Sequence, residues 1–140
     1  RDLRTNVSPV SYCFDANIIV DIFRGDKNLK LKLEKLRDSM EEIFITPITL
    51  CELYNGTYLH HNSDEKVNEV EDYITWSGLL DFNEEAAKEF GKEYFQLSKI
   101  GKLTNEFDLM IACITKVNEL TLVTRDKKHF ENMDVKIEVW

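Results

Sequence analysis

The sequence predicts a three-layer α/β/α domain built on a central, mostly parallel sheet of four to five strands. Three observations support this fold class. Short apolar runs without polar alternation, which are typical of strands buried on both faces, recur along the chain. Amphipathic helical segments stand between these runs, so strands and helices alternate almost throughout. The chain has 140 residues, of which 43% are hydrophobic, and this suffices for one domain with one core.

The first half of the chain contains two predicted strands and three predicted helices. The run VSYCF reads as a buried strand that ends at Asp15, and ANIIVDIF then has helical spacing up to Gly25. Residues 28–41 carry leucines at helical spacing, and EIFIT after them reads as the second strand. Pro47 suits the first turn of the next helix, which we expect to be weakened or bent at Gly56.

The second half continues the same alternation. Residues 64–76 form an amphipathic surface helix, and the short apolar run GLLDF follows as a strand. Asn83 caps a long helix whose acids come early and whose lysines come late, as the helix dipole favours. Thr104 or Asn105 caps the apolar helix FDLMIACITKVN. Residues 120–124 (LTLVT) are the clearest strand, and KIEV is the last one.

A single domain is expected over residues 11–140, with no linker, repeat or low-complexity segment. Residues 1–10 lack an initial Met and an apolar signal region, so we expect a cloning remnant or a disordered N-terminus. No apolar run approaches the roughly 20 residues of a membrane-spanning helix, which predicts no membrane association. Cys13, Cys51 and Cys113 lack zinc-ligand spacing and stand in apolar stretches, which predicts buried thiols in a cytoplasmic protein.

The charge balance limits the classes of nucleic-acid binding that are open to this chain. Its formal net charge is −8, which argues against a simple basic nucleic-acid binder because such proteins need clustered Lys and Arg. An enzyme that brings divalent cations to the phosphate remains open, as does a protein with a basic partner.

Four acidic residues stand near the ends of predicted elements. Asp15 closes the first strand, where it either belongs to a site at the carboxyl edge of the sheet or caps the next helix. Glu52 and Asp126 follow later strands, and each has an ordinary alternative role at a helix terminus or in a turn. Asp108 is the most informative, because it begins an apolar helix and has no Lys or Arg at i+3 or i+4.

Together these four carboxylates predict a metal site. If the element ends meet at one edge of the sheet, the side chains converge, and several close carboxylates do not all stay ionised without cations between them. Hard oxygen ligands of this kind select Mg²⁺ or Mn²⁺. The chemistry that such a cluster favours is metal-assisted hydrolysis of a phosphodiester bond.

Four segments in this order resemble the PIN-domain ribonucleases, and most closely the VapC-type toxins of prokaryotic toxin–antitoxin pairs. The segments are FDANIIVDIFRG, TPITLCELYNG, NEFDLMIACI and LVTRDKKHF. The resemblance covers roughly residues 11–140 and implies a parallel-sheet α/β/α fold with Mg²⁺- or Mn²⁺-dependent endoribonuclease activity.

The resemblance also implies roles for particular residues and partners. The C-terminal segment of a small antitoxin is expected to lie across the active-site groove, and the toxin is expected to form a homodimer that acts on RNA. The implied catalytic and metal-binding residues are Asp15, Glu52, Asp108 and Asp126, with Asn17 and Thr124 as polar supports that orient the carboxylates or a water.

Two other function classes stay open from the residues alone. One is a phosphoryl-transfer or phospho-acceptor domain in which Asp15 is the nucleophile. The other is a PIN-like binding module without activity. Arg125, Lys127 and Lys128 flank Asp126 and either contact RNA phosphate or form a solvated turn, and His129 is expected on the surface.

Overall fold

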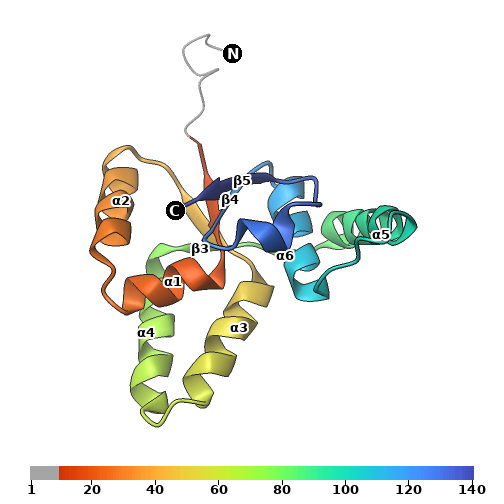
Figure 1. Ribbon diagram of the computed structural model, residues 1–140. Helices are drawn as coiled ribbons and strands as arrows, with labels where there is room; N and C mark the ends of the chain where they lie inside the picture. The colour runs from red at the N-terminus through yellow and green to blue at the C-terminus, as the bar shows by residue number, and fades with distance from the viewer. Residues whose placement is uncertain (1–9) are drawn as a thin grey trace.

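The computed structural model describes residues 10–140 and contains one five-stranded parallel sheet (Figure 1). The strand order is β3-β2-β1-β4-β5, so β1 lies at the centre. The predicted three-layer class is confirmed, with every strand pair in the sheet parallel. The strands are β1 (Tyr12–Phe14), β2 (Ile43–Ile45), β3 (Gly78–Leu79), β4 (Thr121–Thr124) and β5 (Lys136–Val139).

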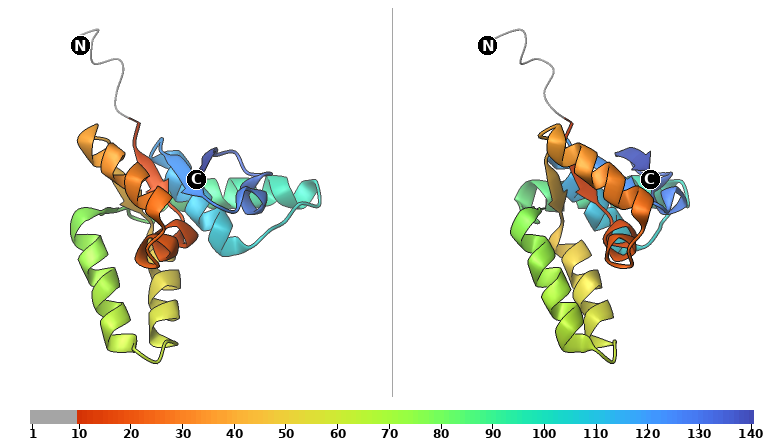
Figure 2. Two further views of the ribbon diagram at one scale, coloured as in Figure 1. Left: turned by 60° about the vertical axis from the view of Figure 1, so that its left-hand side comes forward. Right: turned by 90° about the vertical axis from the view of Figure 1, so that its left-hand side faces the viewer.

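Helices cover both faces of this sheet, and one helix pair projects beyond it (Figures 1 and 2). In Figure 1, α1 and α2 lie on one side of the sheet and α5 and α6 on the other, while α3 and α4 form a hairpin below. The helices are α1 (Ala16–Phe23), α2 (Lys27–Asp38), α3 (Pro47–Tyr58), α4 (Ser63–Trp76), α5 (Glu84–Lys99) and α6 (Glu106–Val117), with a short 3₁₀ helix η2 (Lys127–Phe130).

The alternation of side chains along β1 produces two hydrophobic clusters, one on each face of the sheet. Tyr12 and Phe14 pack with residues of α1 and α2, while Cys13 packs with residues of α5 and α6. Phe14 is fully buried, and burial of such a side chain contributes roughly 1.5–3 kcal/mol to stability. The central strand therefore holds both outer layers, and this fixes where its carboxyl end points.

Side-chain hydrogen bonds cap five of the six α-helices within residues 10–140, and three of these caps were predicted, at Asp15, Asn83 and Asn105. The Asn83 side chain accepts a hydrogen bond from the Ala86 amide at 2.9 Å, which confirms the predicted cap of α5. Of the two candidates for α6, Asn105 is the cap, and its side chain accepts from the Phe107 amide at 2.8 Å. Gly25, after α1, has φ of +88°, a conformation that glycine adopts without a steric penalty.

Three local expectations differ from the structure. The α3 helix runs unbroken through Gly56, because Leu53 and Thr57 on either side are buried and tertiary packing outweighs the low helix propensity of glycine. The Cys51 thiol is exposed on α3 rather than buried, since it lies on the face of the helix that looks away from the core. The β3 strand has only two residues, fewer than the run GLLDF suggested.

Two expectations concern the ends of the chain and the membrane. The expectation for residues 1–10 falls, apart from Val10, outside the described residues. Within residues 10–140, no helix has the length and apolar character needed to cross a bilayer.

The sheet order places the carboxyl ends of β1 and β4 beside each other. After β1 the chain crosses to β2 on one side of it, whereas after β4 the chain continues to β5 on the opposite side. The connections that follow β1 and β4 therefore run in opposite directions across the sheet. Such a switch point creates a crevice outside the carboxyl ends of the strands, where sites form in open parallel sheets. The Asp15 amide extends this pairing by donating to the Val123 carbonyl at 2.9 Å.

Candidate active site

Asp15 is a buried carboxylate that receives a hydrogen bond on each of its oxygens. It directly follows β1, caps α1, and accepts from the Ala16 amide through Oδ1 at 2.9 Å. Its Oδ2 accepts from the Thr124 hydroxyl at 2.8 Å. Only 8% of the residue is exposed, and two donors offset part of the cost of burying a charge. Asp15 therefore caps α1, and it also lies at the crevice outside the carboxyl end of β1.

The Thr124 hydroxyl organises the polar side of this crevice. It donates to Asp15 and accepts both from the Asp126 amide at 3.0 Å and from Asn17 Nδ2 at 3.4 Å. Asn17 Oδ1 in turn accepts from the Arg125 amide at 3.4 Å. Asn17 and Thr124, expected as supports of the carboxylates, thus join α1 to the segment after β4.

Glu52 on α3 and Asp108 on α6 complete a group of three carboxylates with Asp15. Burial, together with the neighbouring charges of Asp15 and Asp108, raises the pKa of Glu52 to about 7. Burial followed by repulsion from Asp15 likewise raises the pKa of Asp108. Burial also raises the pKa of Asp15, against the lowering effect of its hydrogen bond from Thr124. Three acids from three separate elements therefore share one electrostatic environment.

His129 connects the fourth predicted acid to this group, although the sequence suggested only a surface position. Its Nε2 lies 3.1 Å from Asp126 Oδ2, and its Nδ1 lies 3.4 Å from Asp108 Oδ2. The side chain is 57% exposed, so the surface expectation is correct as far as it goes. The sequence could have indicated the contact between His129 and Asp126, because the two residues are three positions apart at a short helix that the buried Phe130 anchors.

The three basic residues next to Asp126 differ from one another in their contacts. The Arg125 guanidinium pairs with Asp26 at 2.9 Å and with Asp21 at 3.3 Å, so it ties this segment to α1 and to the start of α2. Lys127 and Lys128 are exposed on η2, and neither lies within ion-pair distance of an acid in the described part of the chain. Contact of these three residues with RNA stays a prediction.

The donor set fits a hard divalent cation by its chemistry. Asp15, Glu52 and Asp108 offer carboxylate oxygens whose mutual repulsion a cation relieves, and such ligands suit Mg²⁺ or Mn²⁺. The present arrangement is not a closed cage, since among residues 10–140 no three His, Cys, Asp or Glu side chains already surround an ion position.

The comparisons with known proteins agree with this geometry. The model of the PIN domain matches residues 12–136. The chain belongs to the PIN-domain family. Ribonuclease VapC1 of Methanocaldococcus jannaschii is 30% identical over 119 residues, which cover 85% of this chain and 78% of that protein. Ribonuclease VapC2 of Haemophilus influenzae is 27% identical over 124 residues, covering 89% and 92%.

A solved structure extends the similarity to three dimensions. The structure of VapBC-1 from nontypeable Haemophilus influenzae contains a chain that superposes with a TM-score of 0.80 at 25% identity, covering 94% of this chain and 98% of that one. The PIN-domain fold therefore accounts for nearly the whole of the described chain, and the crevice at the carboxyl end of β1 lies within the matched residues.

We predict that Glu52→Gln stabilises the metal-free PIN domain in a pH-dependent way. The pKa of Glu52 lies near 7 in the folded protein, above its ordinary value of 4.5, so the folded state binds this proton more tightly than the unfolded state does. Wild-type stability should therefore decrease as the pH rises through this interval. In EDTA, thermal unfolding should show a higher Tm for the variant at about pH 8 and no difference at about pH 4.

Glu65→Gln is the matched control, because Glu65 is exposed on α4 and belongs to no part of the carboxylate group. An equal gain in Tm for both variants, or a gain for Glu52→Gln that does not change with pH, would contradict the shared electrostatic environment.

Proposed function

We propose that this PIN-domain protein is a divalent-metal-dependent endoribonuclease and the toxin of a type II toxin–antitoxin pair. The observation that carries the proposal is the convergence of Asp15, Glu52 and Asp108, from the end of β1, from α3 and from α6, in one group with raised pKa values. The ribonuclease names of the VapC relatives support the substrate class.

In this proposal the acidic quartet holds Mg²⁺ or Mn²⁺, with Asp15, Glu52 and Asp108 as the inner group and Asp126 beside them. When bound, the ion supplies a nucleophilic water at neutral pH and stabilises charge on the leaving oxygen. Thr124 and Asn17 keep Asp15 and the Asp126 backbone in register through the hydrogen bonds described above. His129 holds the carboxylates of Asp108 and Asp126 at a fixed separation.

The burial of Asp15 disfavours the alternative of a phosphorylated aspartate. A nucleophilic carboxylate needs room for in-line approach of a phosphoryl group, and only 8% of Asp15 is exposed. The alternative of an inactive binding module gives no role to Asp15, Glu52 and Asp108, whose raised pKa values are typical of a catalytic site.

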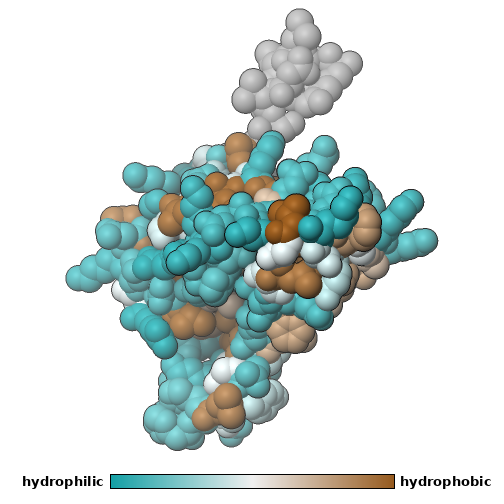
Figure 3. All heavy atoms as spheres, turned by 45° about the vertical axis from the view of Figure 1, so that its right-hand side comes forward, coloured by the Kyte–Doolittle hydropathy of each residue, from teal (hydrophilic) through white to brown (hydrophobic). Residues whose placement is uncertain are grey.

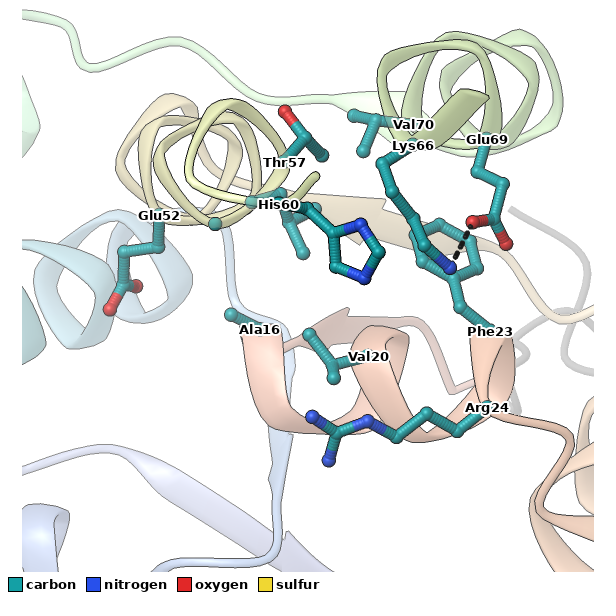
Figure 4. Close-up of a pocket in the computed structure, with 12 residues that line it drawn as sticks. Ala16, Val20, Phe23, Arg24, Glu52, Thr57, His60, Lys66, Glu69 and Val70 are labelled. Carbon is teal, nitrogen blue, oxygen red and sulfur yellow. Dashed lines mark ion pairs between the residues drawn. The ribbon is translucent and has the colours of Figure 1, made fainter. Parts of the chain in front are cut away.

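The proposed protein partner occupies a groove beside the carboxylates, with a volume of about 360 Å³. Apolar side chains from three helices line it, among them Val20 of α1, Leu53 of α3 and Val70 of α4. Figure 4 shows Glu52 at one end of the groove, while Arg24 reaches along it from α1. We infer that an antitoxin segment with apolar side chains and an acidic group for Arg24 fits this groove.

A homodimer is proposed through the face formed by α5 and the start of α6. Large apolar side chains are exposed there, including Phe95, Ile100, Leu103 and Phe107, and Figure 3 shows apolar patches among polar surface on the side of the molecule that it presents. Patches of this kind mark interaction surfaces in otherwise polar proteins.

The cytoplasmic location of this protein remains a prediction.

Asp15→Asn and Asp108→Asn should each abolish metal-dependent RNA cleavage while the protein stays folded. Because metal-assisted stabilisation is worth several kcal/mol, we expect cleavage to fall by about three orders of magnitude. Cleavage of RNA in Mn²⁺ and calorimetric titration with Mn²⁺ are the measurements, and circular dichroism checks the fold. Glu65→Gln should cleave and bind Mn²⁺ as the wild type does; full activity in both aspartate variants would refute the assignment.

Gly56→Phe should block the antitoxin groove without disturbing α3. A Cβ at Gly56 meets no atom within 4 Å, so the added ring extends into the groove, whereas Gly56→Ala leaves it open. When co-expressed with the small protein encoded beside it, the Phe variant should lose co-purification and the Ala variant should retain it. Retention by both variants would place the partner elsewhere.

Phe95→Asp should convert the dimer to a monomer in sedimentation velocity experiments. The Phe95 side chain is 62% exposed on α5, and a charge there opposes burial between two copies. Tyr58→Asp is the matched control, since Tyr58 is 69% exposed at the far end of α3. A dimer that survives Phe95→Asp but not Tyr58→Asp would assign the contact to the α3–α4 hairpin instead.

A further inference from the structure

The α2 helix is strongly basic although the chain as a whole is acidic. Its sequence KNLKLKLEKLRD has five basic and two acidic residues, against a formal net charge of −8 for the whole chain. Leu29, Leu33 and Leu36 are buried and hold the helix on the sheet, so the lysines between them face outward. This basic surface therefore has a fixed position on the molecule.

Two of these lysines line a hollow together with residues from distant parts of the chain. Lys32 and Lys35 share the hollow with Arg125, which follows β4, and with Trp140, which follows β5. Its volume is about 510 Å³. Lys32 Nζ lies 5.1 Å from the centre of the Trp140 ring. In the part of the chain that the structure describes, no acid lies within ion-pair distance of either lysine, so both charges are available to a ligand.

The hollow, which we call the α2 hollow, is linked to the carboxylate group through the contacts of Arg125. Arg125 lines the hollow, and its amide donates to Asn17, whose side chain contacts Thr124 next to Asp15. The Arg125 guanidinium also pairs with Asp26, the residue that caps α2 by accepting from the Leu29 amide at 3.1 Å. Arg125 thus fixes the start of α2 beside the segment that carries Asp126.

The chemistry of the α2 hollow matches a nucleic-acid strand. Lysine ammonium groups bind phosphate as point charges, and each such contact releases counterions from a single strand. The Trp140 ring, which packs against Tyr12 and Phe14, forms an apolar wall of the hollow and holds Lys32 over it. On an acidic body, binding of a polyanion depends on the few places where positive charge is concentrated.

We propose that the α2 hollow is an RNA-anchoring site, in which Lys32 and Lys35 bind backbone phosphates of the strand that enters the active-site crevice. The proposal rests on the proposed ribonuclease function and adds the path of its substrate. It accounts for two exposed lysines that the carboxylate chemistry does not use. It also gives Arg125 a role as the positioning residue that holds the anchoring site and the catalytic crevice together.

The test measures binding of a labelled single-stranded RNA to the full chain by fluorescence anisotropy in EDTA, where cleavage does not compete. Lys32→Gln/Lys35→Gln should weaken binding by about tenfold or more and reduce the slope of log affinity against log salt by about 1.4, since each phosphate contact on a single strand contributes about 0.7. The matched control is Lys88→Gln/Lys102→Gln, which removes two exposed lysines at the α5 side and should bind as the wild type does.

Cleavage in Mn²⁺ separates this proposal from the proposed function. A wild-type protein that cuts no RNA refutes the nuclease assignment whatever the lysines do. A wild type that cuts RNA, with unchanged affinity and salt slope in the Lys32→Gln/Lys35→Gln variant, refutes only the anchoring site. If that variant loses binding to polyglutamate but not to RNA, the hollow receives an acidic protein segment and the proposal is wrong.

Discussion

The hydrogen bond from the Thr124 hydroxyl to Asp15 is the contact on which the rest of the site depends. It joins residues that are 109 positions apart, at the ends of two neighbouring parallel strands. The same hydroxyl accepts from the Asp126 amide and from Asn17, so one buried oxygen sets the relative positions of β1, α1 and the segment after β4. Because the three bonds of this hydroxyl constrain one another, they fix the Asp15 carboxylate relative to the segment that carries Asp126.

The carboxylate group opposes the stability of the fold that carries it. Burial raises the pKa values of Asp15, Glu52 and Asp108, and repulsion from neighbouring carboxylates adds to it, so their ionised forms are less favourable in the folded chain than in water. The two hydrophobic clusters on either face of the sheet offset this cost. Carboxylates with raised pKa values that gather in one crevice of an otherwise regular α/β/α domain are typical of a catalytic site.

Much of the fold follows from local patterns, because strands buried on both faces and amphipathic helices leave clear periodicities. The site was predictable to the extent that Asp15 and Asp126 follow strands and Asp108 lacks a basic partner. Three features depended on tertiary contacts that no window of sequence contains. Packing keeps α3 straight through Gly56, the turn of η2 brings His129 to two carboxylates, and Arg125 brings Lys32 and Lys35 of α2 beside the crevice.

The separation between β1 and β4 along the chain has a consequence for biosynthesis. Asp15 is synthesised 109 positions before Thr124, its hydroxyl donor, and Asp126 follows Thr124. Parallel pairing over such a distance is slow to form because a long loop must close first. A chain that stops before β4 therefore contains Asp15, Glu52 and Asp108 but lacks the Thr124 hydroxyl that orients Asp15.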